Sequence, residues 1–330
     1  MAQATPQPLR SPVRIKVQRI CSILRWGVAL AALLAVAACD MPLKTSITPK
    51  ARPAGLGQPG VQPTSEQSAA LRSYLVQVQA AQLSQGLLRE DGGGPDTPFT
   101  PDMLARNFEQ IVFYNEYASA LQGRGGESLL RRWEGPVRFD TIFGAGVPPS
   151  VRKAEDARIR DYAGRLGRVT GHPVNTLGPA NFIVIVAGED DRDAALNTAA
   201  ARLSGLNAQD LDPLRDFGRD NYCIVIAFAT GPDPNTYTAA VAVVRAENPD
   251  LLRLSCIHEE LAQGLGLAND SRDARPSIFN DDDEFALLTA HDELLLKMLY
   301  DPRLDIGMSA AEAAPITRII ARELTNSGPL

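Results

Sequence analysis

The chain has 330 residues, of which 33 are lysine or arginine and 39 are aspartate or glutamate, so its formal net charge is −6 at pH 7. An acidic chain has no electrostatic reason to bind nucleic acid, which excludes that class of partner. The length leaves room for a domain of about 200 residues with a single hydrophobic core.

The first 38 residues have the pattern of a secretory signal peptide. Residues 1–25 carry five basic residues and no acidic residue, and an apolar run from Trp26 to Ala38 follows. This run is shorter than the roughly 18 residues that a membrane-spanning helix needs. A positive segment, a short apolar core and small residues at its end predict cleavage of residues 1–38.

The sequence Val36-Ala37-Ala38-Cys39 resembles a bacterial lipobox. The resemblance implies that Cys39 carries lipid on its sulfur and anchors the chain to a membrane of the cell envelope, facing the periplasm. An ordinary signal peptide followed by an incidental cysteine is the alternative. Cleavage removes five of the 33 basic residues, leaving 28 against 39 acidic residues and a net charge of −11.

Two helices are predicted after a tether. Residues 39–64 are rich in proline, glycine, serine and threonine, so we expect a flexible linker there. A helix is predicted over 65–89. Thr100-Pro101 supplies an N-cap and a first-turn proline for a second helix, whose apolar face reaches Leu121. The range 65–125 is therefore an N-terminal helical segment.

Residues 126–330 alternate between strand and helix patterns. We expect strands at 133–143, 182–186, 221–229 and 237–246, and helices near 151–169, 192–203, 250–267, 288–300 and 310–324. Pro136 favours an edge position for the first of these strands. The unbroken apolar run from Phe182 to Val186 is typical of a strand covered on both faces. The predicted fold class is α/β (α+β), a mixed sheet preceded by the helical segment.

Two cysteines remain besides Cys39 and the signal-peptide cysteine. Cys223 lies in a strand-like run, and Cys256 lies just before a Glu-Glu pair. Cysteine pairs tend to close in an oxidising compartment, so we predict a disulfide that joins this strand to the following helix. A Cys256–His258 nucleophile pair is the competing hypothesis. It is disfavoured because residues two apart on a helix do not face each other.

The segment from Glu259 to Asp270, EELAQGLGLAND, has the framework of a zinc-peptidase helix. An HExxH peptidase uses two histidines on one helix face, a glutamate as general base and, in the extended motif, a glycine that turns the chain toward a third ligand. Here Glu260 stands at the general-base position and Gly266 at the turn. Glu259 and Gln263 replace the two histidines, and Asn269 or Asp270 takes the place of the third ligand.

This arrangement resembles the metzincins and their matrixin branch. The resemblance implies a metzincin-like mixed sheet with an active-site-type helix over residues 126–330. Ser277-Ile278-Phe279 stands where a matrixin has its methionine turn, and the helix that closes with Leu299-Tyr300 is similar to the C-terminal helix of that group. The chain also resembles, over roughly residues 128–308, an uncharacterised bacterial lipoprotein family with a Glu-Glu-x-x-Gln-x-x-Gly-Leu-x-Asn-Asp core.

Without imidazole ligands, the motif predicts a catalytically inactive, metallopeptidase-like protein that needs no cofactor and binds a peptide or protein partner in the former substrate cleft. The alternative is an active hydrolase in which Glu259, Gln263 and Asp270 hold a hard divalent metal and Glu260 acts as the base, because carboxylate and amide oxygens suit Ca²⁺, Mg²⁺ or Mn²⁺. A third hypothesis is an envelope scaffold whose N-terminal helices dock a partner.

Overall fold

The computed structural model describes residues 64–114, 126–280 and 282–325. The predicted signal peptide, the predicted lipidation site Cys39, almost all of the predicted tether and Leu121 lie outside the described residues. The described residues all belong to one compact unit. In the described ranges, no helix combines the length and the apolar character that crossing a bilayer requires.

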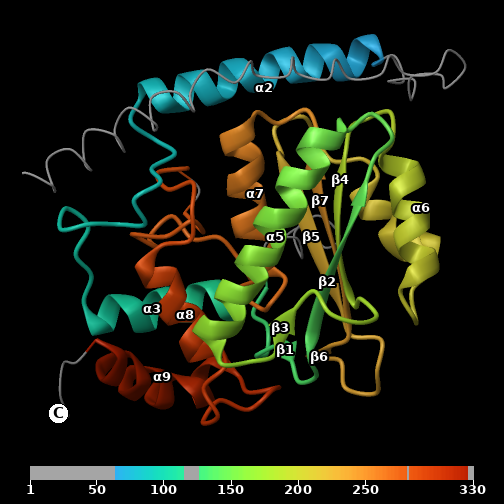
Figure 1. Ribbon diagram of the computed structural model, residues 1–330. Helices are drawn as coiled ribbons and strands as arrows, with labels where there is room; N and C mark the ends of the chain where they lie inside the picture. Colours follow the sequence, from blue (N-terminus) through green and yellow to red (C-terminus); the bar gives the residue numbers. More distant parts are fainter. Residues whose placement is uncertain (1–63, 115–125, 281, 326–330) are drawn as a thin grey trace, which may run out of the picture. The chain divides into compact units, whose positions relative to one another are not determined.

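A five-stranded mixed sheet forms the centre of this unit, with the strand order β3-β2-β4-β7-β5 (Figure 1). Its strands are β2 (Val137–Phe143), β3 (Val174–Asn175), β4 (Phe182–Ala187), β5 (Cys223–Phe228) and β7 (Ala239–Arg245). Strands β3, β2, β4 and β7 pair in parallel, and β5 is an antiparallel edge strand beside β7. The predicted mixed α/β class is confirmed.

Strand β4 explains why both faces of the sheet are covered. All of its residues are buried, as the unbroken apolar run predicted. Phe182, Val184 and Val186 point into one hydrophobic cluster, whereas Ile183 and Ile185 point into a second cluster on the other face. Successive side chains of a strand alternate between faces, so the run supplies two cores at once.

Helices cover the two faces of the sheet separately (Figure 1). Helices α5 (Pro149–Thr170) and α7 (Asp250–Gln263) contribute to the larger cluster, and α6 (Arg192–Arg202) and the 3₁₀ helix η2 (Ala208–Leu214) contribute to the smaller one. Helix α7 ends at Gln263, about four residues before the predicted end, because Gly264 and Gly266 begin a turn there.

The strand expected at 133–143 is interrupted. Arg132–Trp133 forms β1, which pairs with β6 (Thr236–Tyr237), and β2 begins only at Val137. Pro136 lies in the connection and has no N–H to give to a ladder. The predicted edge position is wrong, because β2 lies between β3 and β4.

Three further helices lie together at the lower left of Figure 1: α3 (Pro101–Val112), α8 (Ala290–Leu299) and α9 (Ala310–Leu324). The predicted cap at Thr100 is confirmed, and α8 has a cap of the same kind. The Thr100 side chain accepts from Met103 N, and Thr289 forms a capping box with Asp292. Leu104 and Phe108 of α3 lie in the same core as α8 and α9.

Helix α2 (Glu66–Ser84) runs along the edge of the sheet at which the parallel strands end (Figure 1). Its N-cap is Ser65, whose side chain accepts from Ser68 N. The helix is shorter than the predicted range 65–89, because Gly86 adopts a positive φ of 78° and turns the chain away.

Candidate functional site

The motif helix α7 is fixed at its N-terminus by groups from two other helices. Its N-cap, Pro249, makes no side-chain cap hydrogen bond. Instead, Gln79 Oε1 of α2 accepts a hydrogen bond from Leu252 N at 3.1 Å, which satisfies one of the open backbone donors of the first turn. The fully buried Glu155 of α5 accepts from Arg253 Nε at 2.7 Å. These contacts set the orientation of the helix face that carries the motif.

The predicted disulfide between Cys223 and Cys256 is present. It joins edge strand β5 to the middle of α7, one turn before the glutamate pair. The thiol of Cys256 is therefore consumed. This removes the Cys256–His258 nucleophile pair from consideration.

The two glutamates of the motif lie beside this disulfide. Ligand atoms of Glu259, Glu260 and Cys223 all lie within 4.8 Å of one another, and among the residues that the structure describes this is the group of histidine, cysteine or acidic side chains that approaches metal-site spacing. Cys223 Sγ is bonded to Cys256, so it cannot act as a thiolate ligand. Two carboxylates without imidazole or thiolate do not match what zinc requires.

The other predicted ligands meet each other. Gln263 Nε2 donates a hydrogen bond to Asp270 Oδ1 at 3.1 Å, which links the end of α7 to the loop beyond the turn. Asn269 Nδ2 donates to the backbone carbonyls of Gln110 and Asp270. Asn269 thus bonds to backbone carbonyls, whereas Gln263 bonds to a side chain. Of the residues that would replace the metal ligands, Gln263 and Asp270 are thus joined by a hydrogen bond, whereas Glu259 lies beside Glu260 and Cys223.

Two glycines are required where α7 ends. A Cβ on Gly264 would lie 2.4 Å from the ring of the buried Phe182. Gly266 has a φ of 127°, and a Cβ there would lie 2.5 Å from the Arg131 carbonyl oxygen. Trp133 Nε1 donates to the Gly264 carbonyl oxygen at 2.8 Å. The turn predicted at Gly266 is confirmed, and β1 holds it from outside.

His258 faces away from the motif residues and toward α5. Its ring stacks on Tyr162 with centroids 4.2 Å apart, and its Nδ1 accepts from Leu288 N at 3.1 Å. The Tyr162 hydroxyl also donates to the His258 carbonyl oxygen. Burial, followed by the repulsion of Arg165, lowers the pKa of His258 to about 3. His258 is therefore a neutral structural residue.

Replacing His258 should change how the stability depends on pH. In the unfolded chain His258 takes up a proton below about pH 6.5, whereas in the folded chain it does so only near pH 3. The free energy of unfolding therefore has its full value above pH 6.5 and decreases as the pH falls from 6.5 toward 3. We expect the wild type to lose about 2 kcal/mol from this residue between pH 8 and 5. His258→Asn offers an acceptor near the Nδ1 position, and this loss should disappear in urea unfolding curves.

The half-buried His172 is the matched control for this experiment. Burial lowers its pKa as well, but its ring is more accessible, and its Nε2 lies 2.8 Å from the Gly135 carbonyl oxygen. We expect His172→Asn to retain most of the pH dependence of the wild type. If the free energy of unfolding of His258→Asn depended on pH as steeply as that of the wild type, His258 would not be neutral in the folded protein.

The loop between α7 and α8 is held by one buried carboxylate. Asp292 accepts hydrogen bonds from Ser277 Oγ at 2.5 Å, from Ile278 N at 3.0 Å and from Thr289 N at 2.9 Å. Phe279, in the place of the methionine turn, is fully buried. The sequence places Asp292 in a helix but does not indicate that it holds the loop, because its loop partners lie 14 and 15 residues away.

Residues 101–319 match the family described as "Protein of unknown function (DUF2927)". The matched range covers more than half of the chain. This chain belongs to the DUF2927 family. No curated protein and no solved structure gives a match. The expected membership of an uncharacterised family is confirmed, and the match extends beyond 128–308 at both ends.

The DUF2927 match includes α3 and the motif helix but not α2, which ends at Ser84. The hydrogen bond from Asn269 to Gln110 therefore lies inside the family domain, whereas the cap that Gln79 gives to α7 comes from outside it. The family region thus receives part of its support from the preceding helix.

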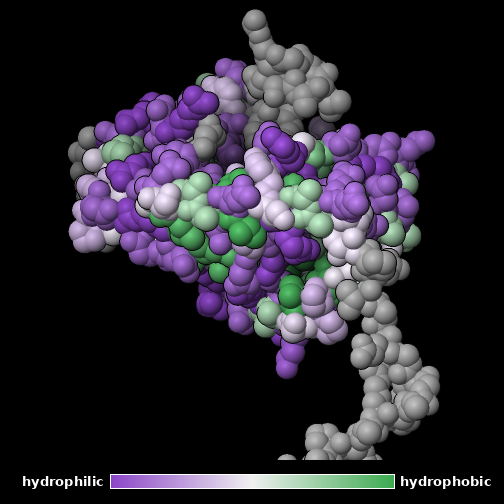
Figure 2. All heavy atoms as spheres, turned by 90° about the horizontal axis from the view of Figure 1, so that it is seen from above, coloured by the Kyte–Doolittle hydropathy of each residue, from purple (hydrophilic) through white to green (hydrophobic). Residues whose placement is uncertain are grey.

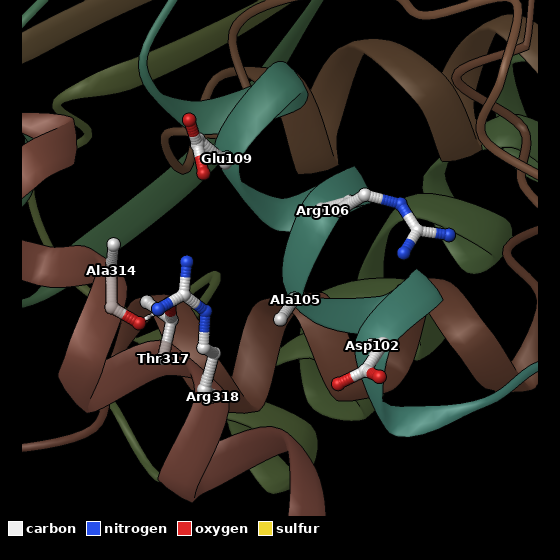
Figure 3. A pocket seen from close by; sticks show the side chains of 7 residues that line it. All are labelled: Asp102, Ala105, Arg106, Glu109, Ala314, Thr317 and Arg318. Carbon is white, nitrogen blue, oxygen red and sulfur yellow. Dashed lines mark hydrogen bonds between the residues drawn. The ribbon is translucent and has the colours of Figure 1, made fainter.

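A cavity of about 290 Å³ opens between α3 and α9 (Figure 3). Its charged lining consists of Asp102, Arg106, Glu109 and Arg318. In Figure 3, Arg318 reaches from α9 toward α3, whereas the side chain of Arg106 points away from Arg318. Two positive and two negative groups give no preference for either sign of charge, and none of the motif residues lines this cavity.

Proposed function

We propose that this DUF2927 protein is a lipid-anchored protein of the cell envelope that faces the periplasm, and that its metallopeptidase-like domain binds a peptide or protein partner without hydrolysing it. The signal-like residues 1–38 and Cys39 motivate the anchor. Recovery of the wild-type protein in the soluble fraction of lysed cells, without lipid on Cys39, would contradict this part of the proposal.

The order of elements supports the metallopeptidase-like part. Strand β2 is followed by helix α5, then by strands β3 and β4, by α6 and η2, by strands β5, β6 and β7, and finally by motif helix α7 with its glycine turn. Apart from the inserted α6 and η2, this is the order that the resemblance to metzincins implies. Glu260, in the general-base position, is buried on α7, with 4% of its surface exposed.

The hydrogen bond between Gln263 and Asp270 carries the argument against hydrolysis. In a metzincin, a metal connects the helix to the loop after the turn. Here the side-chain amide makes that connection directly to the carboxylate. A neutral amide is a weak ligand, and the bond also engages the carboxylate that would replace the third ligand. Glu260 then lacks a metal-activated water to deprotonate.

One observation favours the alternative, an active hydrolase with a hard divalent metal. The carboxylates of Glu259 and Glu260 lie within 4.8 Å of each other, and paired carboxylates suit Mg²⁺, Mn²⁺ or Ca²⁺. In this alternative, Glu259, Gln263 and Asp270 would hold the ion and Glu260 would act as the base.

Elemental analysis of the purified protein distinguishes the two functions. We expect less than about one-tenth of a metal ion per chain, no change in that content on Glu259→Ala or Gln263→Ala, and no hydrolysis of a mixed peptide library. Glu134→Ala is the control for loss of a carboxylate outside the motif. Stoichiometric metal that is lost in both motif variants, together with hydrolysis that disappears in Glu260→Gln, would establish the hydrolase instead.

A further inference from the structure

The glutamate pair of α7 and the disulfide beside it form one compact cluster. Ligand atoms of Cys223, Glu259 and Glu260 lie within 4.8 Å of one another. Cys256 is bonded to Cys223, and it precedes the two glutamates by three and four residues, so their side chains lie on the same face of the helix. The cluster therefore brings together two sulfur atoms from two elements and two carboxylates from adjacent positions of α7.

The ligands that this cluster offers to a cation depend on whether the disulfide is closed. While the bond is closed, the two carboxylates are the groups that can bind, and two carboxylates alone do not match a zinc site. When the bond is open, two thiolates join them. A set of two sulfur and two oxygen ligands fits the tetrahedral coordination of zinc and carries the same total charge as a site of four cysteines. Thiolates also favour zinc over Mg²⁺ and Ca²⁺, which prefer oxygen ligands.

The positions of the two cysteines suit a shared metal ion. Their Cα atoms are 5.8 Å apart. Two thiolates on a tetrahedral zinc ion lie about 3.8 Å from each other, because each Zn–S bond is about 2.3 Å long. Rotation of the side chains separates the sulfurs to this distance once the bond between them is open, so β5 and α7 can keep their places.

A buried amide supports one of the sulfurs. Asn248, which is 1% exposed, donates from Nδ2 to Cys256 Sγ at 3.6 Å and to the Tyr222 carbonyl oxygen at 3.0 Å. The amide thus connects the middle of α7 to the residue before β5. An N–H group that points at sulfur stabilises a thiolate more than a disulfide sulfur. Hydrogen bonds of this kind also hold metal ligands in position.

Solvent reaches Cys223 more easily than Cys256. Cys223 is 8% exposed and Cys256 is 1% exposed, and the adjoining Glu259 is partly exposed. Cys223 also begins an edge strand, at the end of the sheet that α2 crosses. The surface seen from that end is largely hydrophilic, with small apolar areas between (Figure 2). A small, water-soluble dithiol is therefore the class of reductant that suits this protein.

We propose that the disulfide blocks a zinc site, that a dithiol opens this site by reduction, and that its ligands are Cys223, Cys256, Glu259 and Glu260. A thiolate of the dithiol attacks Cys223 Sγ, the S–S bond breaks, and its electron pair goes to Cys256 Sγ. The second thiol of the dithiol then displaces Cys223 from the mixed disulfide. The dithiol leaves as a cyclic disulfide, and its two protons pass to the cysteines, which lose them when they bind Zn²⁺.

In the reduced protein, the zinc site connects β5 to α7 in place of the disulfide. This inference goes beyond the proposed function, in which the domain binds its partner without a metal. It also differs from the hydrolase alternative, because Gln263 and Asp270 take no part and Glu260 binds the metal instead of acting as a base.

The zinc content of oxidised and reduced protein tests this inference. The protein is reduced with dithiothreitol and freed of it by gel filtration under argon, and the gain of two thiols is checked under denaturing conditions. After dialysis against Zn²⁺, we expect about one zinc ion per reduced chain and less than about one-tenth per oxidised chain. Zn²⁺ should also raise the melting temperature of the reduced protein and leave that of the oxidised protein unchanged.

Two further measurements identify the ligands. Co²⁺ in place of Zn²⁺ should give a thiolate-to-cobalt charge-transfer band and the visible bands of tetrahedral Co²⁺ in the reduced protein alone. Glu260→Gln keeps the shape of the side chain and should weaken zinc binding at least about tenfold, in competition with a chromophoric chelator. The matched control is Glu134→Gln, at an exposed position after β1, which should bind zinc like the wild type. Equal zinc contents of oxidised and reduced protein, or equal affinities of Glu260→Gln and Glu134→Gln, would overturn the proposal.

Discussion

Gly266→Ala is expected to destabilise the protein by roughly 3–5 kcal/mol, through backbone strain and a steric clash combined. Gly266 has a φ of 127°, which an alanine rarely adopts, and the added Cβ would lie 2.5 Å from the Arg131 carbonyl oxygen and 3.1 Å from Leu299 Cδ2. Leu299 cannot move away freely, because it is fully buried. Urea unfolding monitored by circular dichroism measures the loss, and the melting temperature should fall by about 10 °C.

Alanine variants of two other glycines distinguish the cost of backbone strain from the cost of the steric clash. Gly171 caps α5 with a φ of 67°, and a methyl group added there would meet no atom within 4 Å, so Gly171→Ala should cost about 1 kcal/mol from strain alone. Gly135 has neither a positive φ nor a neighbour within 4 Å, so Gly135→Ala should be close to neutral. If Gly266→Ala costs no more than Gly171→Ala, the close approach of the Arg131 carbonyl does not constrain the turn.

The sequence correctly predicted the features that depend on residues close together in the chain. The run from Phe182 to Val186 forms a strand buried on both faces, and Thr100 and Thr289 cap the helices that follow them. Each of these features depends on residues within a few positions of one another. The disulfide was predictable for another reason, because one pairing remained once Cys39 and the cysteine of the predicted signal peptide were set aside.

Contacts between distant segments determine the parts that the sequence did not predict. Gln263 was considered as a metal ligand, but its amide donates to Asp270 because the Gly266 turn brings the loop back to the helix. The first turn of α7 is capped by Gln79, 173 residues earlier in the chain. Pro136 suggested an edge strand, yet it lies just before an interior strand, where its missing N–H has no effect on the ladder. No local pattern carries such information.

The helix face that carries the motif is therefore held in place by residues outside the motif. Glu155 and Gln79 fix the beginning of α7, Trp133 and Gly266 fix its end, and β5 is bonded to its middle. Of these supports, the bond to β5 is the covalent one. It lies directly beside Glu259 and Glu260, so its removal tests how firmly the glutamates are held.

The double variant Cys223→Ala/Cys256→Ala is expected to be less stable than the wild type by about 3–4 kcal/mol. The disulfide closes a loop with a sequence separation of 33, and in the chain-entropy description a loop of this length restricts the unfolded state by that amount. The edge strand β5 should be affected first, because it is held in the sheet by β7 on one side only.

Urea unfolding with and without a reductant provides the measurement and its control. Reduced wild type should approach the stability of the double variant, and the reductant should have no effect on the variant itself. The dependence of the unfolding free energy on urea should become steeper without the cross-link, because a less restricted unfolded chain exposes more surface. A double variant as stable as the oxidised wild type would show that hydrogen bonds and packing alone hold β5 against α7.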